Sequence, residues 1–324
     1  SASWDVRHNF MTGESFLSTV KAGCPDALLT AAKARGKFKL LVVRAAGSLP
    51  IQAAYEACME GIASPLLIGE PDIIRSHADT LGWDLDNDII LPATGEQDAA
   101  SVAADYLVQN GTDGVGAIMK GQLHTDVFMG ALLPRSVGLR IGNRLVHVFA
   151  LYPPNGKPPM LISDAAVNVT PDAETSYQSC REMVRLSRLV GHDKARIAVL
   201  SATETPIPSM PQSETAAALT AWVKTEFAER DDVAISGPLS CDLAFSEASA
   251  RIKGLVNDNV AGQANCLLMP EIVAGNILYK AFVYLAGACA AGLVVGGSVP
   301  VLLTSRADPP AARLASIALA AVSR

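Results

Sequence analysis

The segment that follows the apolar run from Val299 to Leu303 carries the residues best suited to hold a phosphate group. Ser305 and Arg306 come just after this run, and Asp308 stands two residues further along. An arginine is planar and always charged, so it can bind two phosphate oxygens at once. The serine hydroxyl can donate a hydrogen bond to developing negative charge, and the aspartate can accept a proton or cap the next helix. We expect Ser305, Arg306 and Asp308 to be catalytic.

Lys120 and Gly121 form a second candidate phosphate site, because they follow the apolar run from Val115 to Met119. A helix is expected to begin just beyond them, at Thr125 or Asp126. The N–H groups of such a turn, together with the lysine ammonium, can hold a phosphate beyond the end of a strand. A solvated turn with a helix N-cap explains the same residues equally well.

Polar residues also follow three other apolar runs of strand length. In open α/β sheets, ligands bind beyond the carboxyl ends of the strands, so we expect these residues to contact a substrate. Gly275 and Asn276 open an apolar helix, where free N–H groups and a side-chain amide can stabilise an oxyanion; a helix cap explains the pair about as well. The candidate substrate-binding residues at these three places are Ser163, Asp164, Ser201, Gly275, Asn276 and Lys280.

Short apolar runs alternate with longer helical segments along the chain, which is the pattern of repeated βα units. Half of the residues are hydrophobic and only 5% are aromatic, a composition typical of helices packed closely on a buried sheet. The sequence therefore predicts the α/β class. The expected strands are Phe38 to Val43, Pro65 to Ile68, Ile89 to Leu91, Val115 to Met119, Leu145 to Leu151, Met160 to Ser163, Arg196 to Ser201, Val233 to Ser236, Asn265 to Met269, Leu293 to Val295 and Val299 to Thr304.

The length of 324 residues suits two domains of ordinary size. A boundary is expected near Gly142 to Leu145, because the stretch from Leu151 to Pro159 contains four prolines and a glycine and is typical of a hairpin connection. A second sheet is expected to begin there. The pattern alone leaves open whether the last strand, which ends at Ser305, completes this second domain or returns to the first.

The composition excludes several classes of protein. With 26 basic and 32 acidic residues, the net charge is −6, which offers no basic surface to nucleic acid or an anionic membrane. The hydrophobic content excludes disorder as the main state. The uncharged stretch from Ala281 to Ser305 is long enough for a membrane span. Its glycines and Pro300 instead predict a helix that ends near Ala291, followed by two strands.

Common catalytic motifs are absent from the sequence: it contains no G-x-G-x-x-G, P-loop, G-x-S-x-G or H-E-x-x-H pattern. The six cysteines are scattered singly, so they are interpreted as small buried residues in a reducing compartment, with no metal site. The first residues lack the apolar core of a signal peptide, so we expect a cytoplasmic protein. Each histidine is interpreted as a surface or core residue rather than a catalytic one; the five are His8, His77, His124, His147 and His192.

With these motifs in place, the chain resembles the phosphate acetyltransferase and phosphate butyryltransferase family from about Lys37 to its end. The Lys-Gly-x-Leu-His-Thr segment is also similar to the transferase module of bifunctional enoyl-CoA hydratase/phosphate acetyltransferase proteins. Six motifs in order carry the resemblance: Met119 to Thr125, Ile162 to Asn168, Ser236 to Leu239 with Asp242, Val260 to Asn265, Ala274 to Lys280, and Val301 to Asp308.

The resemblance implies reversible acyl transfer between acyl-CoA and inorganic phosphate, which gives acyl phosphate and free CoA. It implies an isocitrate/isopropylmalate dehydrogenase-like fold of two α/β/α domains with a cleft between them, residues 1–144 plus 292–324 forming the first and residues 145–291 the second. CoA would be a substrate, with no permanently bound cofactor or metal, and the protein would be a homodimer without nucleic-acid or membrane partners. Ser305 and Arg306 match the serine–arginine pair of the family, whose arginine faces the phosphate.

The sequence also departs from the family pattern. Typical acetyltransferases carry a proposed catalytic aspartate where this chain has Ala312, which leaves Asp308 as the nearby acidic candidate. They carry arginines where Tyr284 and Met129 stand here, so the chain is placed nearer the butyryltransferases. Two alternatives remain: a non-catalytic binder of acyl-CoA or acyl phosphate, and an NAD-dependent decarboxylating dehydrogenase of the same fold. The second normally needs clustered aspartates for a divalent metal, and the sequence shows no such cluster.

Overall fold

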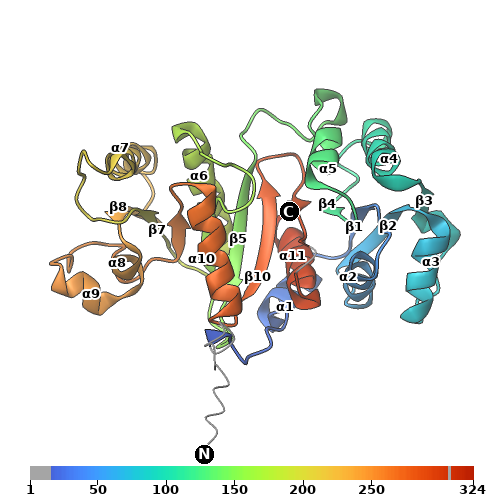
Figure 1. Cartoon of the computed structure of the whole chain (residues 1–324), viewed down its shortest axis with the longest axis horizontal. Helices are drawn as coiled ribbons and strands as arrows, with labels where there is room; N and C mark the ends of the chain where they lie inside the picture. Colours follow the sequence, from blue (N-terminus) through green and yellow to red (C-terminus); the bar gives the residue numbers. More distant parts are fainter. Residues whose placement is uncertain (1–15, 306–307) are drawn as a thin grey trace, which may run out of the picture.

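The protein is described here by a computed structural model that places residues 16–305 and 308–324 (Figure 1). Eleven strands form one hydrogen-bonded sheet in the order β3-β2-β1-β4-β11-β10-β5-β6-β9-β7-β8. Their bounds are β1 Phe38–Val43, β2 Ala63–Gly69, β3 Ile90–Pro92, β4 Ala117–Lys120, β5 Val146–Tyr152, β6 Met160–Ser163, β7 Ala195–Leu200, β8 Val233–Leu239, β9 Cys266–Leu268, β10 Cys289–Val295 and β11 Val301–Leu302.

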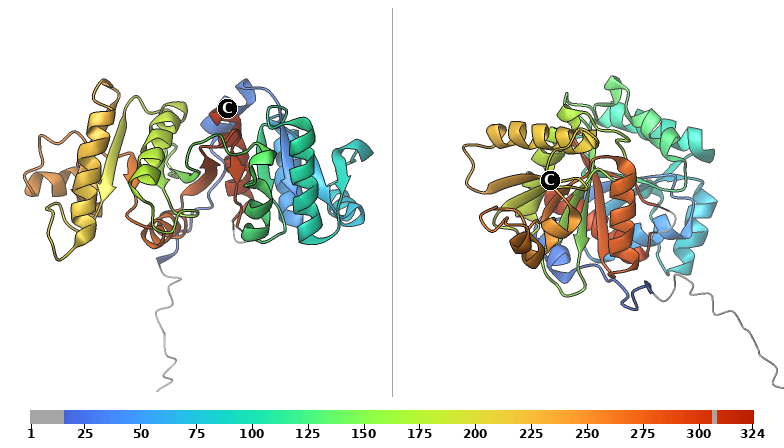
Figure 2. Two further views of the ribbon diagram at one scale, coloured as in Figure 1. Left: turned by 90° about the horizontal axis from the view of Figure 1, so that it is seen from above. Right: turned by 60° about the vertical axis from the view of Figure 1, so that its left-hand side comes forward.

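The helices cover the faces of this sheet, and α7 to α9 and α3 form the two ends of the molecule (Figures 1 and 2). Their bounds are α1 Asp26–Ala34, α2 Ser48–Met59, α3 Pro71–Thr80, α4 Gly95–Asn110, α5 Thr125–Leu132, α6 Ala173–Leu189, α7 Pro211–Glu226, α8 Cys241–Phe245, α9 Glu247–Ile252, α10 Ile272–Tyr284 and α11 Pro310–Ser323. The predicted α/β class is therefore confirmed, and α5 begins at Thr125 as expected.

The sheet is mixed rather than divided in two. Strands β3, β2, β1, β4 and β11 are parallel to one another, as are β6, β9, β7 and β8, while β10 and β5 run antiparallel to their neighbours between the two sets. Seven residue pairs join β10 to β5, from Cys289 with Tyr152 to Val295 with Val146. The expectation of a separate second sheet was wrong, because this antiparallel pair continues the ladder.

Two expectations about the connections are confirmed. Strands β5 and β6 pair antiparallel around the proline-rich stretch, as the hairpin prediction required. Strand β11 lies beside β4, so the end of the chain returns to the N-terminal strands. The predicted helix end near Ala291 was wrong: α10 ends at Tyr284 and the small residues that follow form β10. Alanines suit a helical pattern, but here Ala290 and Ala291 lie in a strand on which α11 packs closely.

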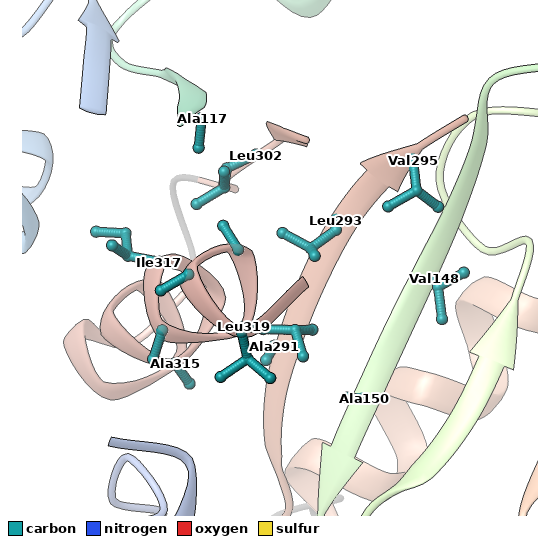
Figure 3. Packing of buried hydrophobic residues seen from close by; sticks show 14 of the residues in the cluster. Ala117, Val148, Ala150, Ala291, Leu293, Val295, Leu302, Ala315, Ile317 and Leu319 are labelled. Atoms are coloured by element: carbon teal, nitrogen blue, oxygen red, sulfur yellow. The ribbon is translucent and has the colours of Figure 1, made fainter. Parts of the chain in front are cut away.

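Helix α11 fills the centre of the molecule. Eleven of its 14 residues are buried, and Ile317 and Leu319 belong to the same hydrophobic cluster as Leu293 and Leu302 of the sheet, part of which Figure 3 shows. Burying one such side chain fully is worth roughly 1.5–3 kcal/mol. The last helix therefore stabilises the place where β4, β11 and β10 meet.

The uncharged stretch near the C-terminus is part of this sheet. In the residues that the structure describes, no helix is both long and apolar enough to cross a membrane. Cys180, Cys266 and Cys289 are buried as expected, but Cys241 is exposed at the start of α8. The prediction of six buried cysteines was therefore wrong for Cys241, which opens a helix beyond the end of β8, and holds only in part for Cys24 and Cys58, which are half-buried.

Candidate active site

Lys120, the last residue of β4, is tied directly to the chain that follows β11. Its side chain is almost completely buried, and Nζ donates to the Leu123 carbonyl at 2.9 Å. Its own carbonyl accepts a hydrogen bond of 2.7 Å from the Thr304 hydroxyl. The parallel pairing of β4 with β11 thus brings two predicted site segments together, although they lie 184 residues apart in the chain.

The chain around Ser305 is held on both sides of that residue. Its N–H donates to the Asp308 carboxylate at 2.6 Å, and its carbonyl accepts a hydrogen bond from the guanidinium of Arg313, a buried residue of α11. Arg306 lies outside the described residues. The interpretation of Asp308 as a cap of α11 was wrong, because Pro309 occupies the N-cap position and the Asp308 carboxylate turns back to Ser305.

Several cations act on Asp308. Burial raises the pKa of its carboxyl above the ordinary value, while the Ser305 N–H and the charges of Arg313, Lys120 and Lys280 oppose that rise. Lys280 lies on α10, which follows β9. Three predicted site residues therefore act on Asp308: Ser305 through a hydrogen bond, and Lys120 and Lys280 through their charges. Arg313 was missed, because an arginine inside an alanine-rich helix gives no sequence signal of this kind.

Gly275 and Asn276 do not offer free N–H groups at the start of α10. The Glu271 carboxylate caps that helix through Val273 and Ala274, and the Gly275 N–H donates to the Glu271 carbonyl at 3.3 Å. A Cβ at Gly275 would lie 2.4 Å from the Asp164 carbonyl oxygen. Gly275 is therefore small because α10 packs tightly on the turn after β6, and the oxyanion role of the pair stays a prediction. The Asn276 amide contacts the Ala165 carbonyl at 3.4 Å.

Ser163 and Asp164 are likewise occupied within the protein. The Ser163 hydroxyl is fully buried and donates to Ser179 at 2.9 Å. The Asp164 carboxylate, in a side chain only 2% exposed, accepts four hydrogen bonds of 2.7–3.0 Å. The donors are the His147, Ala166 and Val167 N–H groups and the Asn168 amide. Both side chains are therefore hydrogen-bonded within the protein, and their contact with a substrate stays a prediction.

Ser201 stands at the end of β7, which β6 and β9 separate from β5. Its hydroxyl faces the Met210 sulfur at 3.6 Å. Within residues 16–305 and 308–324, no polar contact links Ser201 to Lys120 or Asp308. The structure therefore does not bring Ser201 together with the other candidate residues.

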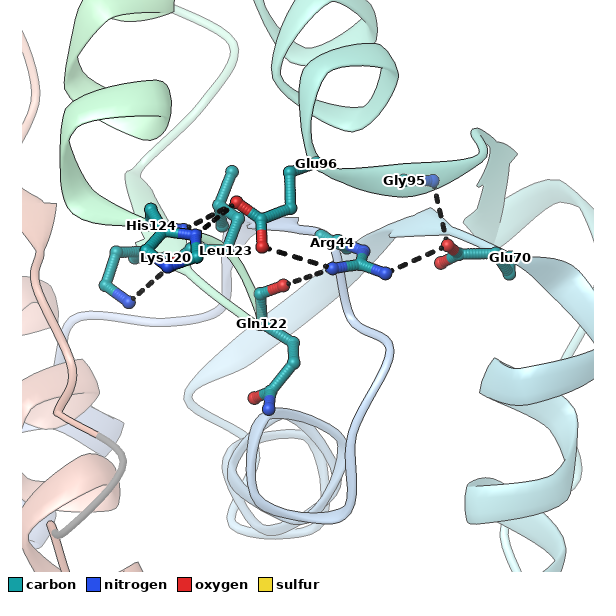
Figure 4. A network of polar contacts seen from close by, with 8 residues as sticks. All are labelled: Arg44, Glu70, Gly95, Glu96, Lys120, Gln122, Leu123 and His124. Atoms are coloured by element: carbon teal, nitrogen blue, oxygen red, sulfur yellow. Dashed lines mark hydrogen bonds and ion pairs between the residues drawn. The ribbon is translucent and has the colours of Figure 1, made fainter.

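The turn from Lys120 to His124, called the Lys120 turn, is held from the side of β1 by Arg44, which sequence reasoning missed (Figure 4). Its guanidinium donates to the Gln122 carbonyl at 2.8 Å and to Glu70 at 3.3 Å, and it lies 3.6 Å from Glu96. Arg44 has a φ of 55°, a left-handed conformation that is uncommon for arginine. A Cβ at Gly121 would lie 2.2 Å from the Arg44 carbonyl oxygen. Gly121 therefore serves close backbone packing.

His124 ends the same turn and is bound to Glu96 twice (Figure 4). Its backbone N–H and its ring Nδ1 both contact Glu96 Oε2, at 3.0 and 2.7 Å. These hydrogen bonds from His124 lower the pKa of the Glu96 carboxyl. Glu96 comes from the first turn of α4, 28 residues earlier in the chain. A local sequence pattern therefore does not indicate that the two residues interact.

A groove of about 580 Å³ opens beside this turn. Thr125 and Met129 of α5 form one wall and Leu303, just before Thr304, forms part of another. Arg140 and Arg144 add positive charge to a lining that is otherwise largely apolar; the remaining lining residues are Asp126, Leu133, Asn143, Leu145, Ala166, Val167, Asn168 and Thr175. In the part of the chain that the structure describes, no group of three or more His, Cys, Asp or Glu side chains is arranged to hold a metal ion.

The chain is similar to known transferases over most of its length. The family model described as "Phosphate acetyl/butaryl transferase" matches residues 97–321. A phosphate acetyltransferase of Rhizobium meliloti is 36% identical over 92% of both chains. A phosphate butyryltransferase of Clostridium acetobutylicum is 32% identical over 92% of this chain and 97% of that one.

A solved structure agrees with these relatives. The branched-chain phosphotransacylase from Enterococcus faecalis V583 superposes with a TM-score of 0.71 and is 26% identical, covering 88% of this chain and 99% of its own. The motifs around Lys120 and Ser305, the β4–β11 pairing and these similarities all agree. The chain belongs to the phosphate acetyl/butyryl transferase family.

Proposed function

We propose that this chain catalyses reversible acyl transfer between acyl-CoA and inorganic phosphate at the site formed by Lys120, Lys280, Ser305 and Asp308. The observation that carries the proposal is the meeting of these residues: the charges of Lys120 and Lys280 both act on Asp308, whose carboxylate binds the Ser305 N–H. A phosphate needs cations at hand, and a largely buried lysine supplies one where water is scarce.

The mechanism assigns each residue a part in the transfer. The CoA thiolate attacks the carbonyl carbon of the acyl phosphate, and no covalent intermediate on the enzyme is required. Arg306, by its match to the family pair, and Lys120 neutralise the departing phosphate. The Ser305 hydroxyl, on an exposed residue next to that arginine, donates to the oxygen that becomes negative in the tetrahedral intermediate.

The architecture that supports this chemistry is proposed to be that of the isocitrate/isopropylmalate dehydrogenase fold. Residues 1–144 plus 292–324 would act as one domain and residues 145–291 as the other. Lys120 and Ser305 belong to the first set and Lys280 to the second, which favours a site in a cleft between them. CoA enters as a substrate, with no cofactor bound permanently, and the enzyme works in the cytoplasm.

The direct test mixes the protein, CoA and either acetyl or butyryl phosphate, and follows thioester absorbance. Thioester formation that depends on all three components is expected. The reverse reaction, acyl-CoA with phosphate, should also proceed. A protein that binds CoA in calorimetry but forms no thioester would be a non-catalytic binder, and one that instead reduces NAD with a hydroxy acid would be a dehydrogenase; either result would overturn the proposal.

Arg306→Ala should lose about 2–5 kcal/mol of transition-state stabilisation, which is a loss of roughly 30- to 4000-fold in kcat/KM for acyl phosphate, the range for truncating one member of a desolvated charge pair. Arg251→Ala is the matched control, because Arg251 is an exposed arginine of α9 whose one ion pair among the described residues is with Glu247. An Arg306→Ala enzyme as active as the control would remove Arg306 from the site.

We further propose that the protein is a homodimer joined through α10. This helix is apolar along most of its length, yet within it only Gly275 is buried. Val273, Ile277 and Tyr284 are each about half or more exposed and lie on one face. Lys280, the one charged residue of the helix, is exposed on the same face, so the dimer contact would have to leave its ammonium free to reach the site. An apolar strip of this kind can pair with its own copy about a two-fold axis.

Ile277→Glu should convert the dimer to a monomer in light scattering, because it places a charge in the centre of that strip. Ile252→Glu on α9 is the control, since Ile252 is even more exposed, at 85% against 65% for Ile277, but lies outside the strip. A protein that is monomeric before any substitution would contradict the dimer without affecting the proposed chemistry.

A further inference from the structure

The proposed transfer moves one proton as well as one acyl group. The thiol S–H bond breaks, the sulfur bonds to the acyl carbon, and the carbon–oxygen bond to phosphate breaks. An acyl phosphate dianion and a thiol give a thioester and hydrogen phosphate dianion, so the thiol proton must end on the departing phosphate. A single group that accepts this proton and then donates it balances the reaction in both directions.

Asp308 is poorly placed for that exchange. Its carboxylate binds the Ser305 N–H at 2.6 Å and faces the charges of Arg313, Lys120 and Lys280. These contacts hold the turn that begins at Ser305. Ala312, in the position where typical relatives carry an acid, is a buried alanine of α11. The proton carrier is therefore sought among the other titratable residues of the site.

His124 has the geometry of an oriented proton carrier. Its side chain is 67% exposed, and Glu96 fixes both its backbone N–H and its ring Nδ1. With Nδ1–H donated to Glu96, the other ring nitrogen, Nε2, is the acceptor. Among the described residues Nε2 has no hydrogen-bond partner. A carboxylate that orients an imidazole through one nitrogen and leaves the other for the substrate is the arrangement of known histidine bases.

The residues around His124 and Glu96 keep the Glu96 carboxylate ionised. Arg44 lies 3.6 Å from the Glu96 carboxylate, and the hydrogen bonds from His124 lower the pKa of that carboxyl, so Glu96 stays ionised at neutral pH. The charged residues near His124 are its partner Glu96 on α4, Arg44 beside Glu96, and Lys120 and Asp126 within four residues of it in the chain. Imidazole is the side chain whose ordinary pKa lies nearest neutrality, which suits a group that must both take and give a proton.

The position of His124 fits the reaction as well. It stands in the same turn as Lys120, whose carbonyl is bonded to Thr304 next to Ser305. The residue after it, Thr125, lines the groove of about 580 Å³, and so does Leu303, two residues before Ser305. A thiol arm lying in this groove would approach the acyl phosphate between the two segments.

We propose that His124, oriented by Glu96, takes the proton from the CoA thiol and passes it to the departing phosphate. The proposal rests on the proposed acyl transfer. His124 is then a catalytic residue that touches the thiol, and Glu96 is a positioning residue that acts through it.

The test compares His124→Gln with the wild-type enzyme across pH 6–9.5 in the thiol-to-thioester direction. We expect kcat to fall by about 10²-fold or more near pH 7. The deficit should shrink as the pH approaches the thiol pKa, about 8.5 by analogy with cysteine, because solution then supplies the thiolate. His77→Gln on α3 is the matched control and should behave as wild type, since α3 lies at the far end of the sheet.

Two further variants separate orientation from chemistry. Glu96→Gln should lower kcat less than His124→Gln does, with a shifted pH profile and little change in the KM for acyl phosphate. His124→Ala should regain part of its rate when imidazole is added to the solution. A merely structural role for His124 would predict neither the pH-dependent deficit nor the rescue.

Several results would overturn the proposal. An unchanged kcat for His124→Gln at every pH rules His124 out. So does a loss that is the same at every pH, together with no imidazole rescue of His124→Ala. If Asp308→Asn instead shows the deficit that closes at high pH, Asp308 is the base. Failure of the wild-type protein to form thioester would refute the acyl transfer itself, which is a different outcome from an active His124→Gln enzyme.

Discussion

Two strand ends of this protein carry similar polar motifs in the sequence but do different work in the structure. After β6, Ser163 and Asp164 are buried, and the Asp164 carboxylate receives four hydrogen bonds from the protein. After β4 and β11, Lys120 and Asp308 face other charged residues, and Ser305 is exposed. The first turn uses its polar groups to shape the backbone, whereas the second holds charges near one another. The two regions differ in how many hydrogen-bond donors the protein itself supplies to the carboxylate.

The largest expected effect on stability comes from the turn after β6 that contains Asp164, called the Asp164 turn. Asp164→Ala leaves three backbone N–H groups without their acceptor and removes one of the two hydrogen bonds of the Asn168 amide, which still donates to the Leu145 carbonyl. Each such loss costs about 1–3 kcal/mol. We expect the free energy of unfolding, measured by urea denaturation, to fall by about 4 kcal/mol or more. Asp84→Ala, at an exposed aspartate, should change it little. An Asp164→Ala protein of normal stability that lacks activity would make this turn a part of the site and erase the contrast.

Gly121→Ala tests the other turn through its backbone. The added Cβ would lie 2.2 Å from the Arg44 carbonyl oxygen, so the end of β4 must move away from β1, at a cost of about 2–4 kcal/mol. Activity should fall with it, because Lys120 is the preceding residue. Gly130→Ala on α5 is the control: nothing lies within 4 Å of the new Cβ, and stability should rise slightly. Equal behaviour of the two variants would contradict the tight packing described at Gly121.

His147 makes the Asp164 turn sensitive to acid. Burial lowers the pKa of its imidazole from 6.5 to about 4, although the nearby Asp164 opposes the shift. A histidine held neutral in the fold contributes stability above pH 6.5, and that contribution is lost as the pH falls from 6.5 toward 4. Between pH 7 and 5 the loss should be about 2 kcal/mol. The urea midpoint of His147→Met should fall less between pH 7 and pH 5 than that of the wild type. An equal fall in the variant would assign the acid sensitivity to other groups.

The smallest effect is expected from Asp308→Asn on stability. Burial raises the pKa of this carboxyl, so the fold disfavours its ionised form. The contribution of Asp308 to the free energy of unfolding therefore increases as the pH falls through that raised pKa. The neutral amide avoids this cost and can still accept the Ser305 N–H. Unfolding at pH 7 should change by less than about 1 kcal/mol. A large loss of stability would mean that Asp308 maintains the fold as Asp164 does.

Much of the fold could be predicted from sequence, because buried parallel strands are short apolar runs between helices. Each expected strand corresponds to an observed one, with shifts at the ends. The failure was in how the strands combine: nothing local shows that β10 pairs with β5 and joins the sheet into one. The residues from Cys289 to Gly292 are too small to distinguish a strand from a helix by pattern.

The candidate site was predicted in part, for a similar reason. Strand-end reasoning found Lys120, Ser305 and Asp308, because each follows an apolar run. It also selected Asp164 and Gly275, since a sequence does not show which polar groups the fold itself consumes. It passed over Arg44 and interpreted His124 as an ordinary histidine. The partners that give these residues a role, Glu70 and Glu96, become neighbours only when β1, β2, β4 and α4 are assembled.

The pairing of β4 with β11 also sets an order of events during synthesis. Thr304 emerges 184 residues after Lys120, which at about 5–20 residues per second takes roughly 10–40 s on the ribosome. During that interval the N–H and C=O groups along one edge of β4 have no neighbouring strand, and an open edge of this kind is a template for aggregation. Until β11 and the buried helix α11 arrive, the nascent chain therefore needs this edge to be shielded, and Lys120 and Ser305 meet only after most of the chain has been made.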